Sequence, residues 1–445
     1  MSNSRLTVAY LTSGAGGMYC GSCLHDNTLA RALCQLGVDA QLIPTYTPIR
    51  TDEDDISVDQ VFFGGANVFL QQKIPFFRFL PGFFDRILDH PKILRWLTSR
   101  GMQTSAKQLG ALAVSMLRGV EGNQRKEVRR LCSWLKSTVK PDLIVTSSVL
   151  IAGCAATLKQ QLKVPILVTL QGDDIFLEGL IEPYKSQALD QIENLVKHVD
   201  GFLVNSEYYR DFMSDYLKID KEKFRVVPLG LDVSDFADHA AQPIERKEPR
   251  PPTVGFLARL AEEKGLHILV EAFLLLRRLP GTESTRLHIA GWLGSPNEAY
   301  ANEQFAKLEA AGLSDAFWYA GTVSRREKIE FLHGLDVLSV PTTYREPKGL
   351  FVLEAIAAGV PVVQPDHGAF PELIQRLGGG RLTPPNDPEQ LAAALHELLT
   401  NPEDRKELAS RGRELLHKNH HAEAMAQATL DLYASFLPAH QKSID

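Results

Sequence analysis

Residues 336–363 read DVLSVPTTYREPKGLFVLEAIAAGVPVV, and this stretch decides the fold. A short apolar run predicts a strand at Val337–Val340, and a longer apolar pattern predicts a helix at Leu350–Ala358. A second short strand is expected at Pro361–Gln364. A strand, a loop, a helix and another strand in this order are typical of a βαβ unit with parallel strands. The stretch therefore predicts an α/β fold.

The same alternation extends in both directions along the chain. Continuous apolar runs are typical of parallel strands that are buried on both faces. The remaining expected strands are Leu6–Leu11, Leu143–Thr146, Ile166–Leu170, Phe202–Val204, Thr253–Leu257, Leu287–Ala290 and Phe317–Ala320. The remaining expected helices are Asn27–Leu36, Leu266–Arg278, Glu303–Ala311, Pro388–Thr400, Pro402–His417 and Ala422–Leu437.

A chain of 445 residues is too long for one ordinary core, so two domains are expected. The polar segment 237–252 holds four prolines and is typical of a linker. It separates a Rossmann-like domain at 1–236, which carries a Phe-rich insertion at 64–126, from a second Rossmann-like domain at 253–418. A C-terminal helix in 419–445 is expected to pack back on the first domain. Ligands of such folds bind at the C-terminal ends of the strands, which here implies a cleft between the domains.

The composition is that of a soluble globular protein, with 44% hydrophobic and 23% charged residues. The net charge of −6 disfavours a nucleic acid as the partner. No apolar run reaches the roughly 18 residues that span a bilayer. The N-terminal MSNSRLTVAYLTSG is typical of a first strand and not of a signal peptide. We therefore expect a cytoplasmic protein whose five cysteines are reduced.

Two acids, Glu346 and Glu354, flank the expected helix start at Gly349. The free N–H groups and the positive end of that helix can hold a phosphate, and Lys348 adds a positive charge. Glu354 can accept the hydroxyls of a ribose, and Glu346 those of a transferred sugar. A hydrolase pair is the rival interpretation, but eight helical residues span about 12 Å, more than glycosidase carboxylates need. Taken alone, the pattern would favour a surface acid at Glu346 and a solvated helix residue at Glu354.

Two cations, Arg259 and Lys264, follow the expected strand Thr253–Leu257 and precede the next helix. A leaving diphosphate gains negative charge as its glycosidic bond breaks, and fixed cations stabilise that charge. A basic turn paired with Glu262 or Glu263 would explain Lys264 alone. Because both motifs stand at strand ends of one domain, the functional interpretation is favoured.

The second half resembles the donor-binding domain of family-four glycosyltransferases of the GT-B architecture. The stretches that carry this resemblance are VGFLARLAEEKGLHILVEAF (254–273), LHIAG (287–291), FWYAGTVS (317–324), DVLSVPTTYREPKGLFVLEAIAAGVPVV (336–363) and GAFPELI (368–374). The resemblance covers essentially the whole chain, but it is looser before residue 253. It implies two Rossmann-like domains that face each other across a cleft.

The resemblance assigns roles to particular residues. Arg259 and Lys264 correspond to the residues that hold the donor diphosphate. Glu346 corresponds to the acid that contacts the donor sugar, and Glu354 to the acid that contacts the ribose. Members of the family retain the anomeric configuration and use no metal or cofactor, so a nucleotide-diphosphate sugar is the expected co-substrate. The further donor contacts implied are Lys348, Gly349, Leu350, Phe351 and Val323.

The first half matches the family through HDNTLARALCQLGVDAQLI, VNSEYYRDFM and RVVPLGLDVSDF. The phosphate-facing glycines are expected at Gly16 and Gly17, with a turn at Gly21 as the alternative. Many relatives carry a histidine where this chain has Gln171, and an amide cannot titrate. Asp173 or Asp174 is a candidate acceptor-side base, and a role in capping the next helix is equally open.

Two further features stay outside these motifs. Cys20 and Cys23 form a CxxC pair, which is half of a zinc or redox site, and two loop cysteines beside the donor cleft are the simpler interpretation. The Phe-rich stretch IPFFRFLPGFFDRIL (74–88) suggests an acceptor site or contact with a membrane surface. Phe62, Phe63 and Phe69 are expected in the core.

The sequence thus predicts a retaining, metal-independent hexosyltransferase whose acceptor is a hydroxyl of a glycan, a lipid-linked compound or a small molecule. A nucleotide-sugar epimerase or phosphorylase on the same fold is the enzymatic alternative. An epimerase needs no acceptor pocket, so the Phe-rich insertion weighs against it. A non-catalytic nucleotide-sugar-binding regulator stays open because the family histidine is absent.

Overall fold

A computed structural model of the chain describes residues 5–14, 20–64, 68, 72, 106–236 and 250–438. The chain divides into two units. Unit 1 comprises Met1–Val227 and Ala426–Asp445, and unit 2 comprises Pro228–Met425. The sequence predicts the first division at residue 236, which lies after the observed one. It predicts the second division at residue 418, which lies before the observed one.

Unit 1 contains a sheet of six parallel strands in the order β2-β1-β3-β4-β5-β6. Its strands are β1 (Thr7–Thr12), β2 (Asp39–Pro44), β3 (Leu143–Thr146), β4 (Ile166–Thr169), β5 (Gly201–Val204) and β6 (Phe224–Val226). Its described helices include α1 (Gly21–Gln35), α5 (Ala106–Leu117), α6 (Arg125–Trp134), α7 (Ala155–Leu162), α8 (Asp173–Glu178), α9 (Tyr184–Leu195) and α10 (Glu207–Leu217).

Unit 2 contains a second sheet of six parallel strands in the order β12-β11-β10-β7-β8-β9. This is the doubly wound order of Rossmann folds, so the predicted α/β fold with two Rossmann-like sheets is confirmed. The strands are β7 (Thr253–Leu257), β8 (Arg286–Ala290), β9 (Phe317–Tyr319), β10 (Val337–Leu338), β11 (Val362–Pro365) and β12 (Gly380–Thr383). The helices are α12 (Leu266–Leu276), α13 (Glu298–Ala310), α14 (Arg325–His333), α15 (Leu350–Ala357), α16 (Phe370–Leu377), α17 (Pro388–Thr400) and α18 (Pro402–Asn419). Helix α19 (Ala422–Phe436) begins in unit 2 and lies mostly in unit 1.

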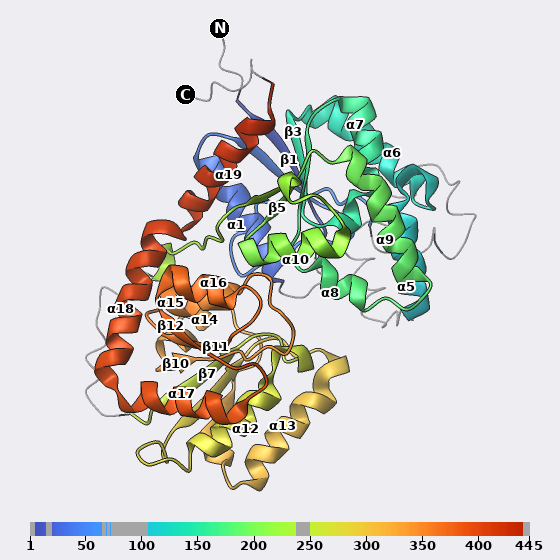
Figure 1. The fold of residues 1–445 in the computed structure, drawn as a ribbon. Helices are drawn as coiled ribbons and strands as arrows, with labels where there is room; N and C mark the ends of the chain where they lie inside the picture. Colours follow the sequence, from blue (N-terminus) through green and yellow to red (C-terminus); the bar gives the residue numbers. More distant parts are fainter. Residues whose placement is uncertain are drawn as a thin grey trace. The chain divides into compact units, whose positions relative to one another are not determined.

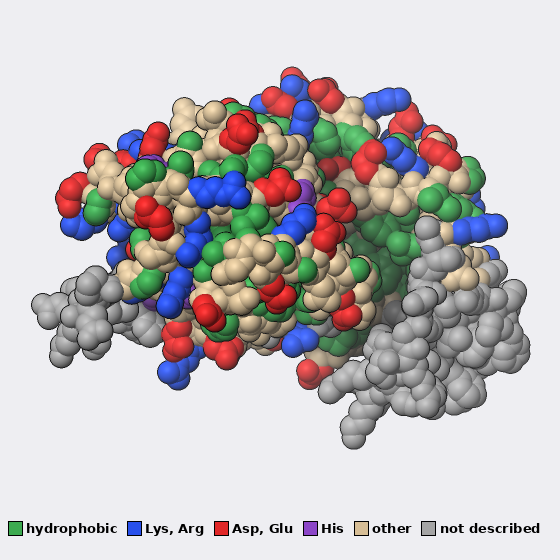
Figure 2. Space-filling model, turned by 90° about the horizontal axis from the view of Figure 1, so that it is seen from below, with side chains coloured by type: hydrophobic (Ala, Val, Ile, Leu, Met, Phe, Trp, Pro, Cys, Tyr) green, Lys and Arg blue, Asp and Glu red, His purple; other side chains and the backbone are tan. Residues whose placement is uncertain are grey.

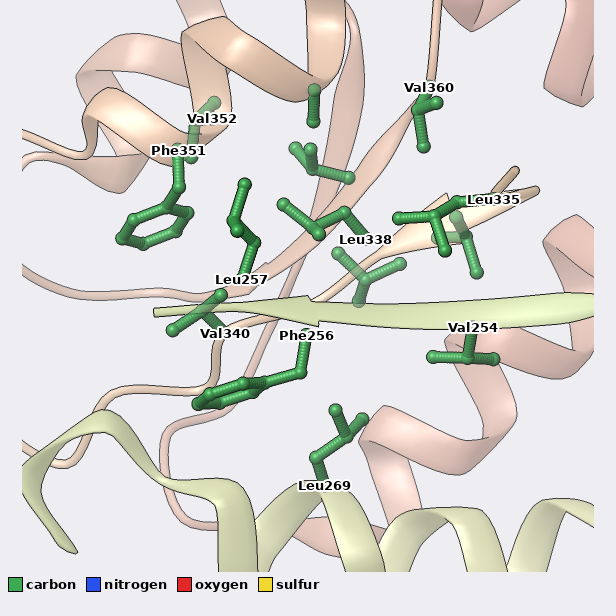
Figure 3. Close-up of a cluster of buried hydrophobic side chains, with 14 of the residues drawn as sticks. Val254, Phe256, Leu257, Leu269, Leu335, Leu338, Val340, Phe351, Val352 and Val360 are labelled. Atoms are coloured by element: carbon green, nitrogen blue, oxygen red, sulfur yellow. The ribbon is translucent and has the colours of Figure 1, made fainter. Parts of the chain in front are cut away.

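Helices cover both faces of the unit 2 sheet, with α15 and α16 on one side and α12 and α17 on the other (Figure 1). Strand β7 is buried along its whole length, and its successive side chains point to opposite faces of the sheet. In Figure 3, Phe256 lies on the side of β7 that faces Leu269 of α12. Leu257 lies on the other side, toward Phe351 and Val352 of α15. This packing fixes the start of α15 against the sheet.

The observed bounds of β3, β7 and α17 equal the predicted ones. Helix α1 begins at Gly21, ahead of the predicted start at Asn27. Glycine and serine at its first positions favour a turn locally, but residues 23–30 are all buried, and packing outweighs that local preference. The predicted core positions of Phe62 and Phe63 are confirmed, because both side chains are buried.

Several predictions concern residues outside the described ranges. Gly16 and Gly17 are among them, as are Phe69, the stretch 74–88 and the linker residues 237–249. Over the described surface, acidic and basic side chains are interspersed in the view of Figure 2. This view agrees with a chain whose opposite charges nearly balance.

Candidate functional site

The strand order of unit 2 reverses between β7 and β10. In open parallel sheets, ligands bind at the C-terminal ends of the strands at such a switch point. The loops that follow β7 and β10 meet there, because the Thr343 N–H donates to the carbonyl of Glu263 over 3.0 Å. Gly265 has a φ of +76°, and a Cβ at this residue would lie 1.8 Å from the carbonyl oxygen of Pro341. Glycine is therefore what lets the two loops approach so closely.

Three side chains from these loops form the switch-point cluster: Lys264, Tyr344 and Glu346. Lys264 Nζ lies 2.9 Å from Glu346 Oε2 and also donates to the Tyr344 hydroxyl. The Tyr344 hydroxyl in turn donates to Glu346 Oε2. Lys264 Nζ stands 4.8 Å from the centroid of the Tyr344 ring. The sequence therefore placed a cation and an acid correctly at one site, but it did not reveal that they contact each other.

Glu346 is buried, and its second oxygen faces the backbone. Oε1 accepts hydrogen bonds from the Gly349 N–H over 3.3 Å and from the Lys348 N–H over 3.4 Å. Burial by itself raises the pKa of Glu346, but the charge of Lys264 and the hydroxyl of Tyr344 lower it to about 2. Burial and the neighbouring Glu346 raise the pKa of Tyr344 well above its ordinary value. At neutral pH the cluster therefore holds a carboxylate, a neutral phenol and a cation.

Helix α15 begins at Leu350, as predicted, and Gly349 precedes it with a φ of +78°. A Cβ at Gly349 would lie 2.9 Å from Leu373 Cδ1. A larger residue at this turn would therefore collide with the core side chain of Leu373. The side chains of Leu350 and Phe351 are buried, which leaves the backbone as the part that a ligand can contact. The first N–H groups of a helix and its positive dipole end suit an anion.

Glu354 lies farther along α15 and is paired with Lys328 of α14. Lys328 Nζ is 2.5 Å from Glu354 Oε1, and both residues are buried. Removal of one partner from such a pair is costly because it leaves the other charge in the interior. The sequence reasoning missed Lys328. Its signal was a lysine on the buried side of α14, next to Ile329 and one turn before Leu332.

Arg259 stands at the end of β7 in an exposed pair, with its Nη2 2.9 Å from Glu263 Oε1. Exposed pairs of this kind contribute little energy, so the guanidinium can exchange this partner for an anion at small cost. Val323 follows β9 and packs, partly buried, against the unit 2 core. These two predicted contacts therefore lie at the ends of β7 and β9.

His367, which follows β11, is a second residue that the sequence reasoning missed. Its Nε2 lies 3.4 Å from Thr342 Oγ1 in the loop after β10. Burial lowers the pKa of His367, so the ring is neutral at pH 7. The adjacent Gly368 has a φ of +62°, and a Cβ there would lie 2.7 Å from the backbone nitrogen of Glu346. The loop after β11 thus lies directly against the backbone of Glu346.

Unit 1 has its own polar group of side chains at the C-terminal ends of β1 and β4. Its centre is Asp26 of α1, which is 0% exposed. Its Oδ2 accepts from the Thr12 hydroxyl over 2.7 Å, and its Oδ1 accepts from the Tyr10 hydroxyl over 3.1 Å. Gln171 Nε2 donates to the same Oδ1 over 2.8 Å, and His25 Nδ1 lies 3.3 Å from it. The sequence reasoning named Gln171 but missed Asp26.

The two acids that follow Gln171 are held by local hydrogen bonds. Asp173 Oδ1 accepts from the Ser148 hydroxyl over 2.5 Å and from the Val149 N–H over 2.8 Å, and its Oδ2 accepts from the Gln171 N–H over 2.9 Å. Asp174 accepts from the Tyr209 hydroxyl over 2.6 Å. Burial raises the pKa of both carboxyl groups. Both acids lie in the first turn of α8, and Gly172 occupies its N-cap, so neither acid stands at the capping position.

Cys20 precedes α1, and Cys23 lies buried in its first turn. The interpretation of both as loop cysteines is therefore wrong for Cys23, because α1 begins earlier than the glycines suggested. Within the ranges that the structure covers, no three His, Cys, Asp or Glu side chains are grouped to hold a metal ion. In the same ranges, no helix is long and apolar enough to cross a membrane.

Two family models match the chain. The model for glycosyl transferases group 1 matches residues 239–415, and the model for glycosyltransferase family 4 matches residues 112–235. The chain belongs to the family-four, group 1 glycosyltransferases. The predicted enzyme class, a nucleotide-sugar-dependent glycosyltransferase, is thereby confirmed.

Curated relatives of this glycosyltransferase include glycogen synthase of Mycobacterium tuberculosis. It is 27% identical over 299 residues, which are 66% of this chain and 69% of the relative. Phosphatidyl-myo-inositol mannosyltransferase of Mycolicibacterium smegmatis is 28% identical over 243 residues, which are 54% of this chain and 56% of the relative.

Solved structures with the same fold include Anabaena HepE in complex with UDP, with a TM-score of 0.64 and 17% identity over 97% of this chain and 100% of that chain. Sucrose-phosphate synthase from Thermosynechococcus elongatus has a TM-score of 0.67 and 19% identity over 96% of this chain and 98% of that chain. The likeness confirms the predicted GT-B fold of the glycosyltransferase. The roles of individual residues stay predictions.

Proposed function

We propose that this glycosyltransferase moves a hexose from a nucleoside-diphosphate sugar to a hydroxyl acceptor, with retention of the anomeric configuration and without a metal ion. The observation that carries the proposal is the switch-point cluster of Lys264, Tyr344 and Glu346 beside the start of α15. It brings a cation, a carboxylate that is ionised at neutral pH and the N-terminal N–H groups of a helix to one place, which matches the chemistry of a sugar joined to a diphosphate.

In this proposal Lys264 and Arg259 stabilise the charge that develops on the departing diphosphate. Both cations contact carboxylates in the structure, Lys264 with Glu346 and Arg259 with Glu263. A bound diphosphate would take over these cations, and fixed cations would then supply the charge that a metal ion supplies in other transferases. The acceptor hydroxyl attacks the anomeric carbon from the face that the diphosphate leaves, which preserves the configuration.

Glu346 and Glu354 divide the recognition of the donor. Glu346 is ionised and accepts hydroxyls of the transferred sugar. Glu354 accepts ribose hydroxyls while Lys328 holds one of its oxygens at 2.5 Å. The backbone from Gly349 to Phe351, with Lys348 beside it, meets the phosphate and the sugar. Val323, at the end of β9, lies near the base.

The acceptor is proposed as a hydroxyl compound of the glycan, lipid-linked or small-molecule kind. Curated relatives are named glycogen synthase, phosphatidyl-myo-inositol mannosyltransferase and D-inositol 3-phosphate glycosyltransferase. These names favour a hydroxyl acceptor without selecting its class. We propose a cytoplasmic location, at the inner face of the membrane where the acceptor is lipid-linked.

Calorimetry with a panel of nucleoside diphosphates and their sugars tests the donor site. We expect one base to bind clearly, and we expect Arg259→Ala to weaken that binding by at least about tenfold, since it removes a charge-assisted contact. Glu354→Gln keeps an acceptor for Lys328, and we expect it to weaken nucleotide binding by a similar factor. The matched control is Arg326→Ala, because Arg326 is an exposed arginine of α14 that pairs with Glu330.

Unchanged affinity in both Arg259→Ala and Glu354→Gln would contradict the site assignment. Activity that persists in excess EDTA supports the metal-independent reaction, and loss of activity that Mg²⁺ or Mn²⁺ restores would contradict it. The anomeric configuration of the product, read by proton NMR, decides retention. Formation of a sugar 1-phosphate from a glycan and added inorganic phosphate, with cleavage of the glycosidic bond, would identify a phosphorylase instead.

A further inference from the structure

Unit 1 contains a small polar cavity between helices α5 and α9, lined by residues that the proposed function does not use. The two helices lie side by side in Figure 1, and the loop 118–123 between α5 and α6 completes the lining. The volume of this α5–α9 pocket is about 240 Å³. Pockets for drug-sized ligands begin at roughly 300 Å³, so this one suits a small ligand or one unit of a larger one. The lining residues that carry the argument are Ala111, Arg118, Glu121, Asn123, Tyr184 and Gln187.

The loop 118–123 is held in place by two close backbone approaches. A Cβ at Gly122 would lie 1.9 Å from the carbonyl oxygen of Ser115 on α5. A Cβ at Gly119, whose φ is +57°, would lie 2.1 Å from the carbonyl oxygen of Gly153. Only glycine permits backbones to come this close. The loop is therefore anchored on two sides, and this wall of the pocket does not depend on a ligand for its shape.

Hydrogen bonds among side chains orient the amide of Asn123. Its Nδ2 donates to Gln72 Oε1 over 2.7 Å, and the same oxygen accepts from Gln124 Nε2 over 3.4 Å. Gln124 Oε1 accepts from the Ser115 hydroxyl over 2.7 Å, and that hydroxyl oxygen accepts from the Asn123 N–H over 2.9 Å. In such a network each group has one role, since every donor must meet an acceptor. The Oδ1 atom of Asn123 is then the acceptor that no described residue uses.

Three further polar side chains line the pocket: the guanidinium of Arg118, the carboxylate of Glu121 and the amide of Gln187. Within the described ranges, none of the three makes a hydrogen bond or an ion pair with another side chain. Together they present donors and acceptors to whatever enters. The ring of Tyr184 adds an aromatic surface, and its place is fixed because a Cβ at Gly110 of α5 would lie 2.7 Å from it.

The chemistry of this lining favours a neutral ligand that carries several hydroxyl groups. One cation, Arg118, and one anion, Glu121, leave the lining without net charge, so a phosphate is disfavoured. An apolar ligand would displace water from the amides without replacing its hydrogen bonds. A sugar ring has hydroxyls that both donate and accept, and its C–H groups can pack on the ring of Tyr184.

We propose that the α5–α9 pocket binds one neutral sugar ring. The ring is either a unit of a glycan acceptor or a free monosaccharide. With the first source the inference rests on the proposed function, and it narrows the acceptor to a glycan that the enzyme holds at a second point. Attachment at two points raises the effective concentration of the acceptor hydroxyl at the transfer site.

Saturation-transfer NMR on the full chain tests the site, with the methyl glycosides of glucose, galactose and mannose as probes. We expect the wild type to bind at least one of them. Ala111→Phe fills the pocket from α5 and should abolish that binding. Gln187→Ala removes one hydrogen-bonding group and should weaken it about fivefold. Gln191→Ala is the matched control, because Gln191 lies one turn farther along α9 and outside the lining.

Three results would overturn the proposal. They are the absence of binding to every glycoside, an Ala111→Phe variant that binds as the wild type does, and displacement of the glycoside by inorganic phosphate. Circular dichroism melting shows whether Ala111→Phe folds. If it does not, Gln187→Ala carries the test, since its side chain bonds no other described residue, and equal affinities for Gln187→Ala and Gln191→Ala would then be decisive against the site.

Steady-state kinetics identify the source of the sugar ring. If the ring belongs to a glycan acceptor, Gln187→Ala raises the KM for that glycan and leaves kcat and the KM for the donor within about twofold. If the ring is a free monosaccharide, Gln187→Ala weakens the glycoside but leaves the KM for the acceptor within about twofold. Either pattern supports the proposal, because the affinity for the glycoside falls in both.

A failure of the proposed function gives a different result. If the wild type binds no nucleoside-diphosphate sugar but the pocket variants weaken the glycosides, the sugar site stands and glycosyl transfer is wrong. If the wild type turns over a donor but binds no glycoside, glycosyl transfer stands and the sugar site is wrong.

Discussion

The ionisation of Glu346 determines which chemistry this residue can perform. Because its pKa is lowered to about 2, the carboxylate holds no proton near pH 7. A glycosidase needs one carboxyl group with a raised pKa that protonates the leaving oxygen. Glu346 cannot supply that proton, so a hydrolase pair would need Glu354 as the acid, and Glu354 is held in a buried ion pair with Lys328. Its charge agrees with the proposed role of Glu346 as an acceptor of sugar hydroxyls.

A pH prediction follows from the same group. The pKa of Glu346 falls from 4.5 in an unfolded chain to about 2, so its ionised form stabilises the folded protein above pH 4.5. That stabilisation is on the order of 3 kcal/mol and is lost as the pH falls from 4.5 through 2. We expect Glu346→Gln to lower the free energy of unfolding by about this amount at pH 7 and by less at pH 3. Urea unfolding at both pH values measures the difference.

Glu403→Gln on α18 is the control for this prediction, because Glu403 pairs with Lys406 on the exposed surface. Exposed pairs contribute little, so the control should unfold almost as the wild type does. A Glu346→Gln variant as stable as the wild type at pH 7 would show that the switch-point cluster does not hold a stabilising charge.

Residue types at strand ends were predictable, whereas their partners were not. Arg259, Lys264 and Glu346 stand next to apolar runs whose ends the sequence reveals, so their place at one edge of the sheet could be inferred. Lys328 and Asp26 lie inside helices, where a charged residue looks like part of a solvated face. Their burial depends on packing that no local pattern encodes.

At the scale of elements, the close approach of two loops builds the site. The loop after β7 and the loop after β10 touch at Gly265 and Pro341, and this contact brings Lys264 within reach of Glu346. Loops on a rigid parallel sheet are where functional residues gather. The geometry of the switch-point cluster therefore depends on one contact between two backbone segments.

We expect Gly265→Ala to destabilise the protein and to weaken nucleotide binding together. The new Cβ would stand 1.8 Å from the Pro341 carbonyl, which forces the two loops apart. Gly312→Ala is the matched control, since Gly312 has a φ of +73° but open space where a Cβ would stand. Backbone strain alone costs about 1 kcal/mol in the control, and the collision should add at least about 2 kcal/mol at Gly265. Equal unfolding free energies for the two variants would contradict the role of this contact.

In the unit 2 sheet, the central strand β7 was predicted from the sequence, whereas the edge strand β12 was not. β7 lies between two strands and is apolar throughout, so its bounds were predicted without error. β12 was missed because it pairs with β11 alone, and three of its four residues are half-buried. An edge strand needs fewer apolar residues, so its pattern resembles a loop.

At the scale of the whole molecule, each unit carries its own hydrophobic core. The buried cluster of unit 2 spans Leu229 to Leu416, the cluster of unit 1 spans Ala9 to Phe224, and they share no residue. Each core is of the size that single domains reach. The stability of one unit can therefore change without an equal change in the other.

We expect a nucleoside diphosphate to protect unit 2 in particular. At a concentration of 100 times its Kd, the ligand stabilises the folded state that binds it by about 2.7 kcal/mol. Hydrogen exchange should slow in the loops that follow β7 and β10 and in α15, and much less in β3 and β4 of unit 1. Mass spectrometry of peptic fragments reads this segment by segment. Protection confined to unit 1 would contradict the assignment of the nucleotide to the switch-point cluster.

The discontinuity of unit 1 also sets an order of events during translation. Unit 2 is complete in the chain at Met425, but unit 1 still lacks Ala426 to Phe436. That last segment brings Tyr433, whose pKa burial and the charge of Asp26 raise, and Phe436, which packs against Gly201 of β5. A ribosome thus finishes the unit that we propose to bind the nucleotide before it finishes the unit that contains Asp26. A nascent chain can therefore acquire nucleotide affinity before its first unit is complete.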